Sequence, residues 1–188
     1  MSKVLVYQPL GIENGQFAHP VNSGDYETVY ALVNGTARAS TWRPLAFQLI
    51  SSDEGVQLTP VDVPWFGSNA LVFRQRALEA LMPLLRQHGE FLPLASKPKL
   101  WIFNPTRVID AFDQSASNVS RFSDGRIMLI HAHAFKPHML TDSLVFKIPD
   151  LRVSPTFFTH LLVQQIQSLG LTGLQFNLIW EGVGAQAS

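Results

Sequence analysis

Three histidines stand close together in the segment HAHAFKPH, and their type and spacing are the strongest sign of chemistry in this sequence. His131 and His133 are two residues apart, which on a β-strand places both imidazoles on one face. His138, from the next loop, could complete an open metal site for a metal-dependent hydrolase. The segment continues into Ala, Phe, Lys and Pro rather than into a carboxylate. We therefore favour the alternative of a polar or partner-facing strand surface, and we predict no metal and no cofactor.

Two aspartates in VIDAFDQSAS are the next candidates for chemistry. Asp110 and Asp113 could divide acid and base roles between them. A spacing of three near the end of a short helix is more typical of an aspartate that caps the following loop. The sequence contains no phosphate-binding glycine loop, no nucleophile elbow and no His-Glu-x-x-His motif. We accordingly expect no catalytic residue and no enzymatic activity.

Aromatic residues in the irregular segments are candidates for contact with a partner. Trp65 and Phe66 lie in VPWFGSN, and Trp42 lies in another stretch without clear periodicity. Interface hot spots favour tryptophan, so we predict that these three residues face a partner. Two alternatives stay open: burial in the core, and a small-molecule pocket lined by Trp65 and neighbouring aromatics. Trp101 belongs to an apolar strand pattern and is expected in the core.

Composition excludes several classes of protein. The chain has 188 residues, of which 46% are hydrophobic and only 15% charged, so we expect one domain, 1–188, with a possible N-terminal subdomain, 1–67. Fourteen basic residues balance fourteen acidic ones, which argues against nucleic-acid binding. Absence of cysteine excludes disulfides and thiolate chemistry. The apolar run at the N-terminus is too short for a signal peptide, and no segment approaches a membrane span. We expect a cytoplasmic protein.

The periodicity predicts an α+β fold, with a mostly antiparallel sheet and two main helices packed against it. Predicted strands cover 3–8, 28–33, 45–50, 90–94, 99–103, 144–149 and 174–181, and a hairpin joins 118–122 to 126–135 through Ser-Asp-Gly. The main helices are expected at 74–89, with a kink or break at Pro83, and after Pro155 up to Leu169. A short helix is expected from Asn104 as N-cap to Asp113.

The C-terminal stretch GLTGLQFNLIW is predicted to be architecture rather than a ligand site. Gly170 follows the last helical residue, where a left-handed conformation favours glycine, and Leu171 is placed to pack back on the helix. Alternation after Gly173 predicts a strand whose buried face carries Leu174, Phe176, Leu178 and Trp180. A phosphate-binding loop would instead precede a helix.

The order of four segments resembles a known family. GEFLPL (89–94), LWIFNPTRVIDAFDQSAS (100–117), LVFKIP (144–149) and GLTGLQFNLIW (170–180) follow one another as in a bacterial immunity-protein family first described as a domain of unknown function. The resemblance covers residues 68–181. Members of that family are encoded beside toxins of polymorphic, contact-dependent or type VI secretion systems.

This resemblance implies a protein that binds a cognate toxin in the producing cell and blocks its active site. The motif residues themselves are expected to be scaffold, because their periodicity is that of strands and turns. Residues that face the toxin are expected in the irregular segments 11–24, 35–44 and 62–69, because loops carry binding functions more often than cores do.

Overall fold

The computed structural model describes residues 3–151 and 153–183. Its helices are α1 (Asp25–Leu32), α2 (Gln75–Leu85), α3 (His160–Ser168) and a short 3₁₀ helix, η1 (Pro137–Met139). Its strands are β1 (Lys3–Gly11), β2 (Phe17–Pro20), β3 (Phe47–Ile50), β4 (Ser52–Asp53), β5 (Val56–Gln57), β6 (Leu71–Phe73), β7 (Gly89–Pro93), β8 (Trp101–Pro105), β9 (Asn118–Arg121), β10 (Ile127–Ala132), β11 (Val145–Phe146), β12 (Phe157–Thr159) and β13 (Leu174–Val183). Among these described helices, none is long and apolar enough to cross a membrane.

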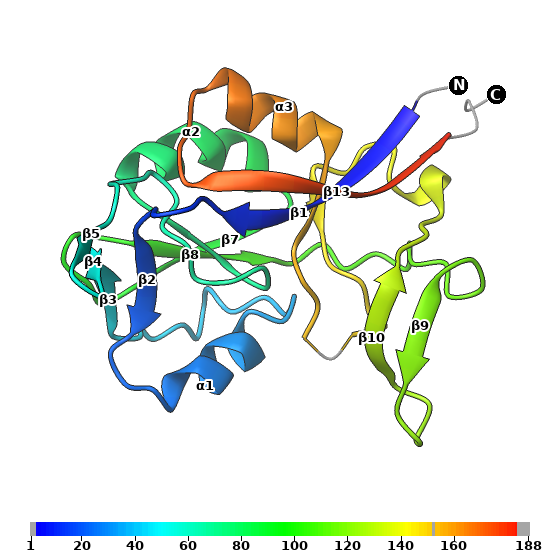
Figure 1. Cartoon of the computed structure of the whole chain (residues 1–188), viewed down its shortest axis with the longest axis horizontal. Coiled ribbons are helices and arrows are strands. Elements are labelled where there is room, and N and C mark those ends of the chain that lie inside the picture. The colour runs from blue at the N-terminus through cyan, green and yellow to red at the C-terminus, as the bar shows by residue number, and fades with distance from the viewer. Residues whose placement is uncertain (1–2, 152, 184–188) are drawn as a thin grey trace.

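All pairings between these strands are antiparallel, so the fold is α+β with few helices and small sheets. A four-stranded sheet has the order β11-β12-β1-β13, and a three-stranded sheet has the order β6-β8-β7. The pairs β2–β3, β4–β5 and β9–β10 form separate two-stranded ribbons, instead of joining the single sheet that we expected. β1 lies beside β13, which brings the first and last strands together (Figure 1).

Side-chain alternation in the three-stranded sheet supplies two separate cores. Leu71, Phe73 and Phe103 pack with buried residues of α2 and α3 in one hydrophobic cluster. Val72 and Ile102 pack with buried residues of α1 and β2–β3 in a second cluster. Neighbouring residues of a strand point to opposite faces, so a three-stranded sheet can be buried on both sides. This sheet is therefore the centre of the molecule.

A third cluster supports the part of the chain that carries β9 and β10. Its buried members come from strands of the four-stranded sheet and from the segments 109–112 and 135–148. The centroid of the Phe135 ring lies within 6 Å of the centroids of several other aromatic rings there, including Phe146 at 5.8 Å and Trp180 at 5.6 Å. Aromatic pairs at such distances stabilise a core beyond their buried area. The hairpin is consequently attached to a packed base.

The predicted strand at 28–33 is wrong, because these residues belong to α1 and its C-terminal cap. Valine favours strands by propensity alone, but Val29 and Val33 are four apart and both are fully buried. A helix places that spacing on one face. Asp25 and Glu27 lie in the first helical turn, where negative charge is favourable. Packing of the two valines and favourable charges at the helix start thus outweigh the strand propensity of the β-branched side chains.

The predicted helix that begins at Asn104 is also wrong, because Asn104 and Pro105 end strand β8. Asn104 is buried, and its side chain accepts a hydrogen bond from the Gly35 amide at 3.2 Å and donates to the Thr36 carbonyl at 2.8 Å. Glu90, which lies opposite Asn104 on the neighbouring strand β7, accepts a hydrogen bond from the Arg38 amide at 2.7 Å. The polar group that resembled a helix cap instead holds the loop that follows α1.

Both main helices form, with different boundaries from those predicted. α2 carries Leu78, Leu81 and Leu85 on its buried face, as its periodicity predicts, and continues as one helix across Pro83. α3 begins only at His160, because the preceding residues form β12 and pair with β1 and β11. The apolar residues assigned to the start of that helix therefore belong to the four-stranded sheet.

The C-terminal stretch has the predicted helix ending. Gly170 has φ of +60°, the Gly170 amide donates to Gln167 O at 3.0 Å, and the Leu171 amide donates to Ile166 O at 3.3 Å. These two bonds define a Schellman motif. The predicted alternation of β13 holds only in part, because its register against β1 shifts between Val6 and Tyr7. Leu178 is consequently 46% exposed instead of buried.

Candidate functional site

The three histidines of the predicted metal site have different environments. His131 is exposed on β10, and its Nε2 lies 2.8 Å from Ser120 Oγ. The His133 ring is stacked on Phe135 with centroids 5.9 Å apart, and burial lowers the pKa of His133. His138 is exposed in η1. Within residues 3–151 and 153–183, no three His, Cys, Asp or Glu side chains are arranged to hold a metal ion. The described part of the chain thus lacks the geometry on which the hydrolase alternative depends.

Asp110 and Asp113 have local structural partners. The Asp113 carboxylate accepts hydrogen bonds from the Ser115 hydroxyl at 2.6 Å and from the Ser115 and Ala116 amides at 3.0 and 3.1 Å. The hydroxyl bond is the main cause of the lowered pKa of Asp113. Asp110 forms an ion pair with Lys136 at 3.3 Å. The Asp113 contacts are those of a turn, whereas Asp110 is paired with a residue 26 positions away in the sequence.

Lys147 is a buried cation that the sequence did not single out. Only 1% of it is exposed, and its Nζ donates to the carbonyls of Asn69 at 2.8 Å and Ser154 at 2.9 Å. Burial lowers the pKa of Lys147 to about 7. Reactive lysines often have lowered pKa values, but they must also meet a substrate. This amine joins two chain segments and has no access to solvent, so we assign it to the architecture.

Phe66 is not available to a partner, contrary to the prediction. It is 6% exposed and lies 5.3 Å from Tyr30 and 5.4 Å from Phe47, measured between ring centroids. The loop folds over the cluster beneath α1, and this places Phe66 in the interior. Trp42 is half-buried, and its Nε1 donates to the Pro93 carbonyl at 2.7 Å. Its indole is therefore tied to the end of β7.

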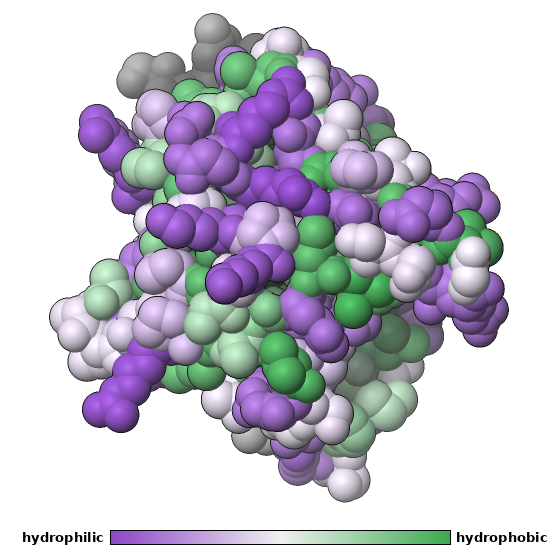
Figure 2. Space-filling model, turned by 90° about the vertical axis from the view of Figure 1, so that its left-hand side faces the viewer, coloured by the Kyte–Doolittle hydropathy of each residue, from purple (hydrophilic) through white to green (hydrophobic). Residues whose placement is uncertain are grey.

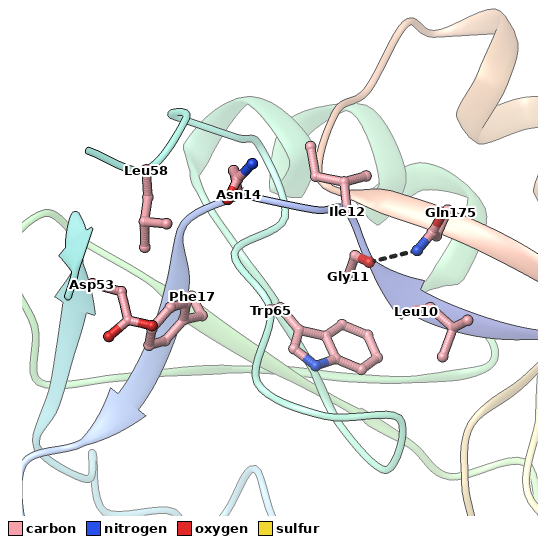
Figure 3. Close-up of a pocket in the computed structure, with 10 residues that line it drawn as sticks. Leu10, Gly11, Ile12, Asn14, Phe17, Asp53, Leu58, Trp65 and Gln175 are labelled. Atoms are coloured by element: carbon pink, nitrogen blue, oxygen red, sulfur yellow. Dashed lines mark hydrogen bonds between the residues drawn. The ribbon is translucent and has the colours of Figure 1, made fainter. Parts of the chain in front are cut away.

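Trp65 lines a cavity of about 450 Å³ between the loop after β1, the β4–β5 ribbon and its own loop (Figure 3). Its backbone pairs with the neighbours of Phe17. The Trp65 amide donates a hydrogen bond to the Gln16 carbonyl at 3.0 Å, and the Ala18 amide donates one to the Trp65 carbonyl at 2.9 Å. A Cβ at Gly11 would lie 2.7 Å from Trp65 Cγ, so only glycine fits there beside the indole. The irregular segments 11–24 and 62–69 thus meet at one cavity.

The β9–β10 hairpin forms a second candidate surface, at a different end of the molecule. It projects from the body as a ribbon that pairs with no other strand (Figure 1). Phe122, Met128 and Leu129 on this ribbon are 49%, 54% and 53% exposed. We call these three residues the hairpin surface. The Ser-Asp-Gly turn predicted the hairpin, but no local signal predicted that its apolar residues stay uncovered.

The base of the hairpin is held in place by hydrogen bonds across its two ends. Asp113 N donates to Ala134 O at 2.9 Å, and Ala134 N donates to Ser117 Oγ at 2.9 Å. A shallow cavity of about 310 Å³ lies beside β10, lined in part by His133 and Val153. The hairpin surface is thus presented on an ordered support, which reduces the entropy that binding would cost.

The end of the molecule that carries β2, β4 and β5 has a different surface character. Hydrophobic residues there form small groups separated by hydrophilic ones (Figure 2). This face therefore has no continuous apolar patch (Figure 2). Comparisons with protein-family models and with curated proteins find no match for this chain.

Proposed function

We propose that this chain is a non-enzymatic binding protein that neutralises a cognate bacterial toxin in the cytoplasm of the cell that makes both. The proposal starts from the resemblance of residues 68–181 to immunity proteins of toxin secretion systems. The observation that carries it is the hairpin surface, where three large apolar side chains remain uncovered on a projecting ribbon. The toxin is expected to be the product of a neighbouring gene.

The physical chemistry of the hairpin surface fits a protein partner. Full burial of a large apolar side chain stabilises a complex by about 1.5–3 kcal/mol, so three half-exposed residues offer on the order of 3 kcal/mol. Methionine and aromatic residues are enriched at interfaces, and Met128 and Phe122 are of these types. Arg126 lies over the Phe122 ring at 5.6 Å and adds a charged group at the rim.

The shape of the hairpin favours inhibition by blockage. A narrow ribbon that projects from the body complements a concave surface, and substrate clefts of enzymes are concave. The turn at 122–126 is at the tip and would enter first, followed by the apolar residues of β10. We therefore propose that the hairpin occupies the toxin's substrate cleft.

The test is co-expression with the neighbouring gene product, scored by growth and by co-purification. Wild-type chain is expected to restore growth and to form a stable complex. Leu129→Asp should weaken the complex at least about tenfold, because a desolvated carboxylate replaces an apolar contact. The matched control is Val56→Asp, since Val56 is 54% exposed, close to the 53% of Leu129, but lies in β5.

Three results would oppose the proposal. The first is a neighbour that is harmless when expressed alone. The second is a toxic neighbour that never binds this chain. The third is loss of protection by Val56→Asp and Leu129→Asp to the same degree, which would place binding elsewhere. Circular dichroism of each variant checks that the fold is retained before its binding is compared.

A further inference from the structure

Lysine and arginine are absent from the two segments of the chain that surround the Trp65 cavity. The segments 4–37 and 44–73 contain no lysine or arginine, and their acidic residues are Glu13, Asp25, Glu27, Asp53, Glu54 and Asp62. Asp62 is paired with Arg76 at 2.6 Å. Every wall of the cavity, apart from Gln175, comes from these two segments. The balanced charge of the whole chain therefore conceals a local excess of negative charge.

Three of these acidic residues line the cavity or adjoin its lining residues in the sequence. Asp53 lines it directly, as Phe17 does (Figure 3). Glu54 follows Asp53, and Glu13 lies between two lining residues, Ile12 and Asn14. All three carboxylate residues are exposed. Negative charge is thus available at the mouth of the cavity.

Aromatic rings supply the other component of the site. Trp65 and Phe17 both line the cavity, and an isolated bridge between their backbones holds them on neighbouring segments. Gln175 donates from its side chain to the Gly11 carbonyl at 2.9 Å, which fixes the wall on the far side of the indole (Figure 3). Aromatic faces attract cations, and tryptophan does so most strongly.

The guanidinium of Arg74, which follows the second segment, donates to Gln16 Oε1 at 2.5 Å and forms no ion pair among the described residues. Among the described residues, Asp53 forms no ion pair with lysine, arginine or histidine. His19 is the nearby titratable base, and Asp53 raises its pKa, but burial is the larger effect and lowers the pKa of His19 overall. His19 is therefore neutral at pH 7 and does not neutralise Asp53. The charge of Asp53 remains available to a ligand.

We propose that the Trp65 cavity binds an organic cation, the guanidinium or alkylammonium group of an arginine, a lysine or a small amine. The carboxylates supply the opposite charge, and the rings of Trp65 and Phe17 supply the faces over which a cation with apolar methylenes can lie. An anion would be repelled by the same groups. The volume of about 450 Å³ accommodates one such group with its aliphatic stem.

This site goes beyond the toxin-binding function and does not depend on it. The β4–β5 ribbon, whose Asp53 lines the cavity, and the β9–β10 hairpin lie at opposite ends of the molecule (Figure 1). A variant at one of them should leave the other unchanged. Failure of either proposal can therefore be distinguished from failure of the other.

The test is titration of the purified chain with N-acetyl-arginine amide and N-acetyl-lysine amide, followed by the indole N–H resonance of Trp65 in nuclear magnetic resonance spectra. The resonance is assigned by its loss in Trp65→Phe. N-acetyl-citrulline amide is the matched neutral probe, since it has the shape of arginine without its charge. Both cations are expected to shift the Trp65 resonance with millimolar affinity, and citrulline is expected to leave it in place.

Variants test the role of charge. Asp53→Asn should weaken binding of the arginine probe roughly threefold, as expected for an exposed ion pair. Asp142→Asn is the control, because Asp142 is exposed and lies outside the acidic segments. An arginine-containing pentapeptide distinguishes the sources: tighter binding than the single residue indicates a protein-borne side chain, and equal binding indicates that a free amine suffices. The proposal is overturned if citrulline shifts Trp65 as arginine does, if no probe shifts it, or if Asp53→Asn binds unchanged.

Discussion

Folding changes the chemistry of Lys147 by burying its amine. Its amine leaves water and exchanges hydration for two backbone carbonyls, those of Asn69 and Ser154. Burial disfavours the charged form, which lowers the pKa of Lys147 from 10.5 to about 7. Below about pH 7 both the folded and the unfolded chain carry the proton, so the cost of burying the charge is fully present. Between about pH 7 and pH 10.5 the folded state releases the proton first, and the cost is relieved.

The consequence is a free energy of unfolding that rises with pH above neutrality. The slope from Lys147 alone should approach about 1.4 kcal/mol per pH unit in this window. Lys147→Met removes the titrating group, so its slope should be smaller by that amount. Urea unfolding of both proteins at several pH values between 6.5 and 9.5 measures the difference.

Lys99→Met is the control for this experiment, because Lys99 is exposed. Its stability should follow that of the wild type at every pH. A stability difference between wild type and Lys147→Met that does not change with pH would show that Lys147 does not titrate in this window.

At the scale of single elements, short sequence patterns correctly predicted helix ends and the buried faces of helices. Gly170 ends α3 with a positive φ, and the leucines of α2 lie on its buried face, because helix ends and helix faces are read from a few adjacent residues. The interpretation of Asn104 was wrong because its hydrogen-bond partners are about 70 residues away in the sequence. The burial expected for Leu178 was wrong because the register between β1 and β13 shifts next to it. The alternation of apolar residues within β13 alone does not reveal such a shift.

For the candidate surfaces too, the sequence predicted the local elements but not which of their side chains are exposed. Trp65 and Phe66 are adjacent in one loop, yet the first lines a cavity and the second is buried, and no pattern in the loop distinguishes them. The hairpin was predicted from its turn, but the exposure of Met128 depends on the absence of a neighbouring strand, which is a property of the tertiary arrangement.

The two glycines of the C-terminal stretch give an element-scale prediction. A Cβ at Gly173 would lie 2.3 Å from Val63 O, and Gly173 has φ of +106°. At Gly170 the nearest atom would be 4.0 Å away, so that substitution strains only the backbone. Gly170→Ala should lower stability by about 1 kcal/mol, and Gly173→Ala by distinctly more. Thermal unfolding of the two variants compares them, and equal losses would contradict the close approach of β13 to the loop at Val63.

At the scale of the whole molecule, two surfaces of different chemistry lie at opposite ends. The hairpin surface is apolar, whereas the Trp65 cavity combines aromatic rings with carboxylates. A net charge of zero does not reveal this separation, because 4–37 and 44–73 contain six of the fourteen acidic residues and none of the lysines and arginines. Binding at the two surfaces should accordingly depend differently on salt concentration.

Salt distinguishes the two surfaces. Raising sodium chloride from about 0.05 to 0.5 M shortens the screening length severalfold. Binding of the arginine probe at the Trp65 cavity should weaken severalfold, and the complex made through the hairpin surface should change little. Parallel titrations at both salt concentrations measure this. A salt-independent arginine affinity would exclude an electrostatic role for Asp53, Glu54 and Glu13.

The measurement that tests the central claim most directly is isothermal titration of the purified chain into the purified product of the neighbouring gene. We predict a one-to-one complex with nanomolar affinity, weakened at least about tenfold by Leu129→Asp and unchanged by Val56→Asp. No binding at micromolar concentrations, or equal affinity for the wild type and Leu129→Asp, would contradict toxin neutralisation through the hairpin.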